Sequence, residues 1–268
     1  MPETSIRAFT VNSVDPPVRG FLHTPETPNG NALVLTHGAG SNAQAPLLVA
    51  LAETFAAAGF TVLRCDLPYR QTRSYGPPGP GDAARDRAGL RNAIAALNTN
   101  QGAPRLPGFG RSGDRDTEVA PPLSRSLRQG GGFDPTKSKK YENVFLAGHS
   151  YGGRQSSMLC AELADQAPDL VAGLLLLSYP LHPPRKPEQQ RTQHLPNLRT
   201  PALFIQGTRD PFASIAEMEQ ALKMIPARTK LVPIEGAGHD LGFKGKMKNA
   251  ELPRLVFSEL TNFFELSS

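Results

Sequence analysis

The fold-defining stretch is Val144-Phe145-Leu146-Ala147-Gly148-His149-Ser150-Tyr151-Gly152-Gly153. Its first four residues are apolar and predict a buried strand. The next five, Gly148 to Gly152, fit the pattern G-x-S-x-G, in which a serine occupies a sharp turn from a strand into a helix. Such a turn exposes the hydroxyl to a base, and the flanking backbone comes so close that only small residues fit. Taken alone, the motif could also be a glycine-rich turn without chemistry.

Apolar strands and amphipathic helices alternate along the rest of the chain. This alternation predicts an α/β fold with a mostly parallel sheet and helices on both faces, and we interpret residues 1–268 as a single domain. In such a sheet, ligands bind at the carboxyl ends of the strands. A hairpin is expected at Ile6–Val11 and Val18–Leu22, further strands at Ala32–Leu35, Phe60–Leu63, Val144–Ala147, Leu170–Leu177, Ala202–Ile205 and Leu231–Ile234, and helices at Pro46–Ala58, Asp82–Leu97, Gly152–Ala167, Ser214–Met224 and Leu252–Leu266.

An acid and a histidine follow the last two predicted strands, in the order that a Ser-His-Asp triad requires on this kind of fold. Asp210 comes just after the strand Ala202–Ile205, and His239 just after Leu231–Ile234. Singly, Asp210 could cap a helix and His239 could be an ordinary loop residue. Because both follow Ser150 at successive strand ends, we interpret the three as a catalytic triad.

Two other carboxylates compete for the role of the acid. Asp240 adjoins His239 and is expected to point elsewhere, and Glu235 follows the strand itself, so both rank below Asp210. In the predicted chemistry, His239 takes the proton of Ser150 as a base and later returns it to the leaving group as an acid. Asp210 orients the imidazole and stabilises its charged form.

Acyl transfer also needs hydrogen-bond donors aimed at the developing oxyanion. One candidate is the N–H of Tyr151, which follows the serine. The other should come from the loop His37-Gly38-Ala39-Gly40, after the strand Ala32–Leu35. We choose Ala39, because a glycine on each side lets its amide turn into the site; a plain glycine turn is the alternative. His37 is interpreted as a structural loop residue.

A basic insertion interrupts the pattern between Asn98 and Lys140. Its 43 residues include seven Gly, five Pro and eight Lys or Arg against four Asp or Glu, which gives this segment a net charge of +4 out of +5 for the whole chain. The body of the protein is therefore nearly neutral, and nucleic acid is not an expected partner. We expect the insertion to be disordered, because it can bury little apolar surface.

Other features add little chemistry. The histidines lack the spacing of metal ligands, and neither a G-x-G-x-x-G after a strand nor a P-loop is present, so no metal or cofactor is expected. Cys65 and Cys160 lie in apolar runs and should be buried free thiols. Basic residues in Pro180–Leu195 are interpreted as a solvated loop, with a basic rim for an acidic substrate as the alternative. Neither a secretory signal nor a membrane-spanning run is visible, which makes the cytoplasm the default location.

Three stretches resemble a known family: Leu35-Thr36-His37-Gly38-Ala39-Gly40, Ser178-Tyr179-Pro180-Leu181-His182-Pro183-Pro184 and Gly207-Thr208-Arg209-Asp210-Pro211-Phe212. Together with the motif around the serine, they resemble the α/β-hydrolase superfamily. Within it they resemble the branch that includes a testis-expressed protein and a subunit of the NSL chromatin complex, and more distantly the dienelactone hydrolases. The resemblance runs from about Leu33 to Phe264, except for the insertion at Asn98–Lys140. It implies the α/β-hydrolase fold, although some members of the branch look like scaffolds.

Two functional hypotheses follow. The first is a serine hydrolase that cleaves a small carboxylic ester or thioester through an acyl-enzyme on Ser150, with a lactonase or an acyltransferase as variations. The second is a non-catalytic interaction or scaffold protein that uses the insertion as its contact segment. The retained triad residues favour the hydrolase, because binding alone has no physical need for all of them.

Overall fold

The computed structural model describes residues 4–98, 140–243 and 251–266. The predicted insertion at Asn98–Lys140 lies outside the described residues except for its two end residues. Within the described ranges, no helix is both long and apolar enough to cross a bilayer.

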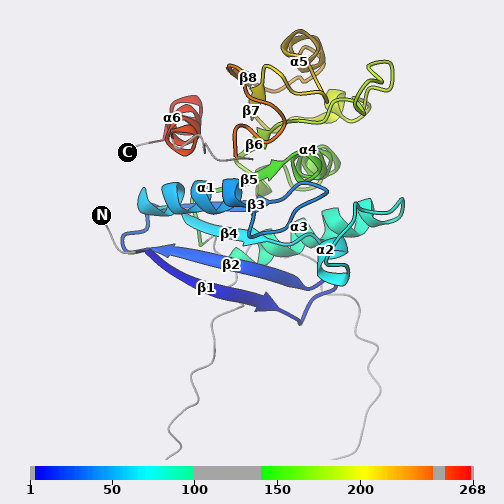
Figure 1. Cartoon of the computed structure of the whole chain (residues 1–268). Helices are drawn as coiled ribbons and strands as arrows, with labels where there is room; N and C mark the ends of the chain where they lie inside the picture. The colour runs from blue at the N-terminus through cyan, green and yellow to red at the C-terminus, as the bar shows by residue number, and fades with distance from the viewer. Residues whose placement is uncertain (1–3, 99–139, 244–250, 267–268) are drawn as a thin grey trace, which may run out of the picture.

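A single eight-stranded sheet organises the chain, with strand order β1-β2-β4-β3-β5-β6-β7-β8 (Figure 1). The hairpin formed by β1 and β2 joins β4 in the antiparallel sense, and all the later pairings are parallel. This confirms the predicted mostly parallel α/β fold. The strands are β1 Thr4–Val11, β2 Val18–Pro25, β3 Asn31–Thr36, β4 Thr61–Cys65, β5 Asn143–His149, β6 Gly173–Leu177, β7 Ala202–Gly207 and β8 Thr229–Ile234.

Helices cover both faces of this sheet and create two hydrophobic cores. Figure 1 shows α1 and α6 on one side of the sheet, and α3 and α4 on the other. Because strand residues alternate between faces, Leu33 and Leu35 of β3 pack with α1 and α6, whereas Val34 packs with α3 and α4. The helices are α1 Pro46–Ala57, α2 Pro68–Thr72, α3 Asp82–Asn98, α4 Tyr151–Leu163, α5 Ile215–Leu222 and α6 Leu252–Phe264.

Some element boundaries differ from the sequence prediction. The helix expected to reach Ala167 ends at Leu163, and a short 3-10 helix at Pro168–Leu170 follows it. The next strand starts only at Gly173, where a side chain would collide with the ring of Phe264. The cysteines Cys65 and Cys160 are buried free thiols, and burial raises the pKa of each to about 12.

The carboxyl ends of the parallel strands bring distant parts of the chain to one edge of the sheet. The loop with Ala39 follows β3, Ser150 follows β5, Asp210 follows β7 and His239 follows β8. The register pairs Gly207 at the end of β7 with the last residue of β8, so the loops that carry the acid and the histidine leave the sheet at the same level.

Candidate active site

Ser150 occupies the sharp turn that the sequence motif predicts. Its backbone has φ 53° and ψ −119°, a conformation that non-glycine residues rarely adopt and that costs about 1–3 kcal/mol. Only glycine fits on either side of the serine, because the backbone is too close for a side chain. A Cβ on Gly148 would lie 2.4 Å from Gly153 N, and a Cβ on Gly152 would lie 2.5 Å from His37 O. The surrounding backbone thus holds the serine in this strained conformation between β5 and α4.

The side chains of Ser150, His239 and Asp210 form a continuous hydrogen-bonded chain. Ser150 Oγ lies 2.8 Å from His239 Nε2, and His239 Nδ1 lies 2.8 Å from Asp210 Oδ2. With Nδ1 donating to the carboxylate, Nε2 carries the lone pair that can accept the serine proton. The Asp210 side chain is fully buried, whereas that of His239 is 24% exposed, so the imidazole remains accessible from the cavity.

Backbone contacts fix the acid and the histidine relative to each other. Phe212 N donates to Asp210 Oδ1 at 2.9 Å, so both oxygens of this carboxylate accept hydrogen bonds. The ring of Phe212 also lies against the imidazole of His239, with 4.2 Å between ring centroids. On the other side, His149 Nε2 donates to the carbonyl of His239 at 2.7 Å. Burial, and then the nearby His239, lower the pKa of His149 to about 4, so this ring is neutral near pH 7.

The two rival acids have other partners. Asp240 Oδ1 accepts a hydrogen bond from Gly242 N at 3.3 Å, and Glu235 Oε1 lies 3.5 Å from the hydroxyl of Thr208. Among the described residues, Asp210 is the carboxylate that contacts the imidazole of His239.

A cavity of about 670 Å³ opens above the serine. Its wall includes both predicted oxyanion residues, Ala39 and Tyr151, and Gly38 is so close that an added Cβ would lie 3.3 Å from Ser150 Cβ. Tyr151 begins α4, where an N–H has no partner inside the helix. The Ala39 N–H likewise makes no hydrogen bond to a described residue. The apolar part of the wall is formed by Leu47, Leu48, Pro77, Pro78, Phe212 and Phe243.

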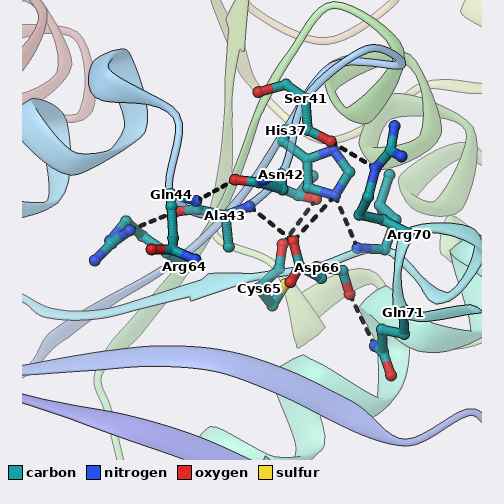
Figure 2. A network of polar contacts seen from close by, with 12 residues as sticks. His37, Ser41, Asn42, Ala43, Gln44, Arg64, Cys65, Asp66, Arg70 and Gln71 are labelled. Atoms are coloured by element: carbon teal, nitrogen blue, oxygen red, sulfur yellow. Dashed lines mark hydrogen bonds and ion pairs between the residues drawn. The ribbon is translucent and has the colours of Figure 1, made fainter. Parts of the chain in front are cut away.

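A polar network holds the loop that carries Ala39, and Figure 2 shows the part of it that links His37, Asp66 and Arg70 to that loop. Two groups donate to the carbonyl of Ala39: Tyr69 OH at 2.8 Å and Arg70 Nη2 at 2.9 Å. The carbonyl of Gly38 accepts from His37 Nδ1 at 2.9 Å. In a trans peptide, the N–H points away from the preceding carbonyl, so fixing Gly38 O also fixes the direction of the Ala39 N–H.

His37 serves this network as a neutral ring. Its Nδ1 donates to Gly38 O while its Nε2 accepts from Leu67 N at 3.1 Å, and one neutral tautomer satisfies both bonds. Burial lowers the pKa of His37, which favours that neutral form. Figure 2 shows Asp66 beside the ring, where it accepts from Ala43 N at 2.7 Å.

A buried carboxylate connects the segments that carry the two predicted oxyanion donors. Asp86 of α3 accepts from Tyr69 N at 3.0 Å and from Tyr151 OH at 2.8 Å. Burial raises the pKa of Asp86. Tyr69 in turn holds Ala39, so Asp86 ties the loop after β3 to the start of α4. The amphipathic pattern of Asp82–Leu97 did not predict these contacts of Asp86, and no motif predicted those of Tyr69 and Arg70.

We also searched the described residues for a metal site. Within the ranges that the structure describes, no group of three or more His, Cys, Asp or Glu side chains could hold a metal ion. Of the basic loop at Pro180–Leu195, Pro180 and Arg191 line the cavity. Part of this segment therefore borders the site, where the sequence analysis had favoured a solvated loop and kept a basic rim as the alternative.

Several solved structures share this fold. A dienelactone hydrolase from Anabaena variabilis matches with a TM-score of 0.62 and 20% identity, over 97% of this chain and 98% of that chain. Est1E from Butyrivibrio proteoclasticus matches with a TM-score of 0.62 and 14% identity, over 97% and 99% of the two chains. An α/β serine hydrolase without a lid, from Xanthomonas campestris, matches with a TM-score of 0.61 and 14% identity, over 99% and 97%. At sequence identities of 14–20%, these matches show a shared fold and no more.

A family model described as an alpha/beta hydrolase domain matches residues 120–257, just over half of the chain. The match includes the segments with Ser150, Asp210 and His239. The resemblance to the narrower branch with the testis-expressed protein and the NSL subunit stays a prediction. On the family match and on its fold, this chain belongs to the alpha/beta hydrolase domain family.

Proposed function

We propose that the protein is a serine hydrolase that cleaves a small carboxylic ester or thioester through an acyl-enzyme on Ser150. The observation that carries the proposal is the hydrogen-bonded chain Ser150–His239–Asp210, with both links at 2.8 Å, at the wall of a cavity of about 670 Å³. A protein that only binds partners has no need for a strained serine aligned with a histidine and a buried aspartate.

In the first half of the proposed reaction, His239 Nε2 takes the proton of Ser150 as Oγ attacks the carbonyl carbon of the ester. The tetrahedral oxyanion accepts hydrogen bonds from the N–H groups of Tyr151 and Ala39. When the intermediate collapses, the carbon–oxygen or carbon–sulfur bond to the leaving group breaks, and His239 gives its proton to that group. Asp210 stabilises the imidazolium that exists between the two proton transfers.

In the second half, water takes the place of the alcohol or thiol. His239 removes a proton from the water, whose oxygen attacks the acyl carbon, and the bond to Ser150 Oγ breaks as the serine regains its proton. The products are a carboxylic acid and the free enzyme. The apolar residues around the cavity, such as Leu47, Leu48 and Phe243, suit the carbon chain of a small acyl group.

A fluorophosphonate probe tests the proposal, because it labels only an activated serine. We expect the wild-type protein to be labelled and Ser150→Ala to lose both the label and ester hydrolysis. Ser41→Ala is the matched control: Ser41 lines the same cavity, but no histidine contacts its hydroxyl among the described residues. A panel of p-nitrophenyl esters of increasing acyl length then measures the preferred chain.

The result that overturns the proposal is a wild-type protein that is folded by circular dichroism but is neither labelled nor active on any ester of the panel. That result favours the non-catalytic interaction protein. Labelling that survives in Ser150→Ala would instead move the nucleophile to another residue.

A further inference from the structure

Two arginines border the cavity beside Ser150. Arg154 lies one helical turn after the serine on α4, and Arg191 comes from the loop between β6 and β7. The two guanidinium groups are close enough for each charge to act on the same neighbours, since both influence the buried ring of Tyr179. One wall of the cavity therefore carries two positive charges.

Neither guanidinium forms an ion pair with a carboxylate in the described part of the chain. Arg154 Nε is buried and has no hydrogen-bond partner there, and Arg191 forms no ion pair with a described residue. A third arginine of this region, Arg87, differs from these two because it has an ion-pair partner. Its guanidinium lies 2.7 Å from Glu162 and 3.0 Å from the side-chain oxygen of Gln155.

Two titratable groups beside Arg154, Tyr179 and His194, are neutral near pH 7. Tyr179 is buried, and burial raises its pKa to about 12, so the phenol stays neutral. Burial, followed by the charges of Arg154 and Arg87, lowers the pKa of His194 to about 4. Asp240 also lines the cavity, where its Oδ1 accepts a hydrogen bond from Gly242 N at 3.3 Å.

A partly buried guanidinium without a partner is costly, because the protein replaces only part of the water that it loses. Burial already lowers the pKa of Arg154, which shows the same loss of hydration. A ligand with a carboxylate supplies what the site lacks, since the fork of N–H donors on an arginine matches two carboxylate oxygens.

We propose that Arg154 and Arg191 form an anion subsite that selects esters or thioesters whose acyl group ends in a carboxylate. The inference rests on the proposed function and names the substrate class for the same site. Ser150 is the N-cap of α4 and Arg154 lies four positions later, about one helical turn along the chain. Half-esters of glutaric and adipic acid differ by one CH₂ group between the attacked carbonyl and the free carboxylate, so together they test the reach of the subsite.

The first test compares matched pairs of esters, with acid release followed in a pH-stat. Monoethyl glutarate is paired with ethyl valerate, and monoethyl adipate with ethyl hexanoate, so that each pair differs in the terminal charge. We expect the wild-type protein to have a higher kcat/KM for the charged member. In Arg154→Gln and Arg191→Gln, the ratio of charged to neutral ester should fall at least tenfold, mainly through KM.

Arg199→Gln is the control for the loss of one positive charge, since Arg199 faces solvent in an ion pair with Asp165 and does not line the cavity. The wild-type ratio should persist in this variant. A wild-type protein without preference for the charged esters, or arginine variants that keep the wild-type ratio, would overturn the subsite.

The second test measures binding without turnover, so that it does not depend on the proposed chemistry. Glutarate and inorganic phosphate are titrated separately into Ser150→Ala by calorimetry, and into the double variants that also carry Arg154→Gln or Arg191→Gln. Glutarate that binds Ser150→Ala and not the double variants supports the subsite, even if no ester is cleaved. Binding of phosphate alone overturns the carboxylate assignment, and binding of neither anion overturns the subsite.

Discussion

Replacing Asp210 by Asn should reduce turnover severely while leaving the fold intact. The carboxylate accepts two hydrogen bonds, from His239 Nδ1 and from Phe212 N, at 2.8 and 2.9 Å. The oxygen of an asparagine can accept only one of them. If that oxygen faces His239, the NH₂ group meets the N–H of Phe212, and a buried donor is left unsatisfied at a cost of about 1–3 kcal/mol.

The opposite orientation of the amide is therefore favoured, with its oxygen toward Phe212 and its NH₂ toward His239. The imidazole must then accept at Nδ1, which puts its proton on Nε2, where it can no longer take the proton of Ser150. To this is added the loss of a hydrogen bond to a charged group, which contributes about 1.5–3 kcal/mol. The two effects total about 2.5–6 kcal/mol, a fall in kcat of roughly a hundredfold to ten-thousandfold.

The assay is the steady-state rate on the best p-nitrophenyl ester, with circular dichroism and a thermal melt to show that the variant folds. Asp240→Asn is the matched control, because Asp240 bonds to Gly242 N instead of the imidazole. Its loss should be at least ten times smaller. A loss of less than tenfold for Asp210→Asn, or a larger loss for Asp240→Asn, would refute the assignment of the acid.

Three further predictions address the surroundings of the triad. Tyr69→Phe removes the hydroxyl that donates to Ala39 O, so kcat should fall severalfold with KM nearly unchanged; equal changes in both constants would contradict a role in aligning the loop. Gly152→Ala places a Cβ 2.5 Å from His37 O, and a urea titration should show a loss of stability of about 1–3 kcal/mol, whereas an unchanged midpoint would mean that the turn can relax. Acidification should destabilise the fold between about pH 6.5 and 4, because His23, His149 and His194 each have a folded pKa of about 4 and an ordinary value of 6.5. The unfolded chain binds more protons in that window, so stability falls as pH falls; urea midpoints that stay flat from pH 7 to 4.5 would be the contrary result.

The sheet could be predicted because its parallel strands are buried on both sides and read as uninterrupted apolar runs. The strands at Ala32–Leu35 and Ala202–Ile205, for example, lie inside β3 and β7. The turn at Ser150 was recognisable because sterics demand glycines at fixed positions around it. By contrast, α2 has only five residues, too few for helical periodicity to appear.

The side-chain network of the site was beyond sequence reasoning, because its contacts depend on how layers pack. Asp86 reads as one more polar residue of an amphipathic helix, yet it bonds to a tyrosine 65 positions away. Arg154 likewise reads as a solvated residue on a helix that begins at the motif. What distinguishes it is a buried Nε atom that has no hydrogen-bond partner among the described residues, and only the packed structure shows this.

The place of β8 at the end of the strand order has a consequence for how the protein loses activity. Among the described strands, β8 pairs only with β7, and most of its side chains are at least partly exposed, yet the loop after it holds His239. Edge segments with few buried contacts open locally at a lower free energy than the core. Sub-global opening of this edge would carry the imidazole away from a serine that remains anchored in the centre of the sheet. Inactivation by mild heat or low urea should therefore be reversible and should precede the cooperative loss of secondary structure.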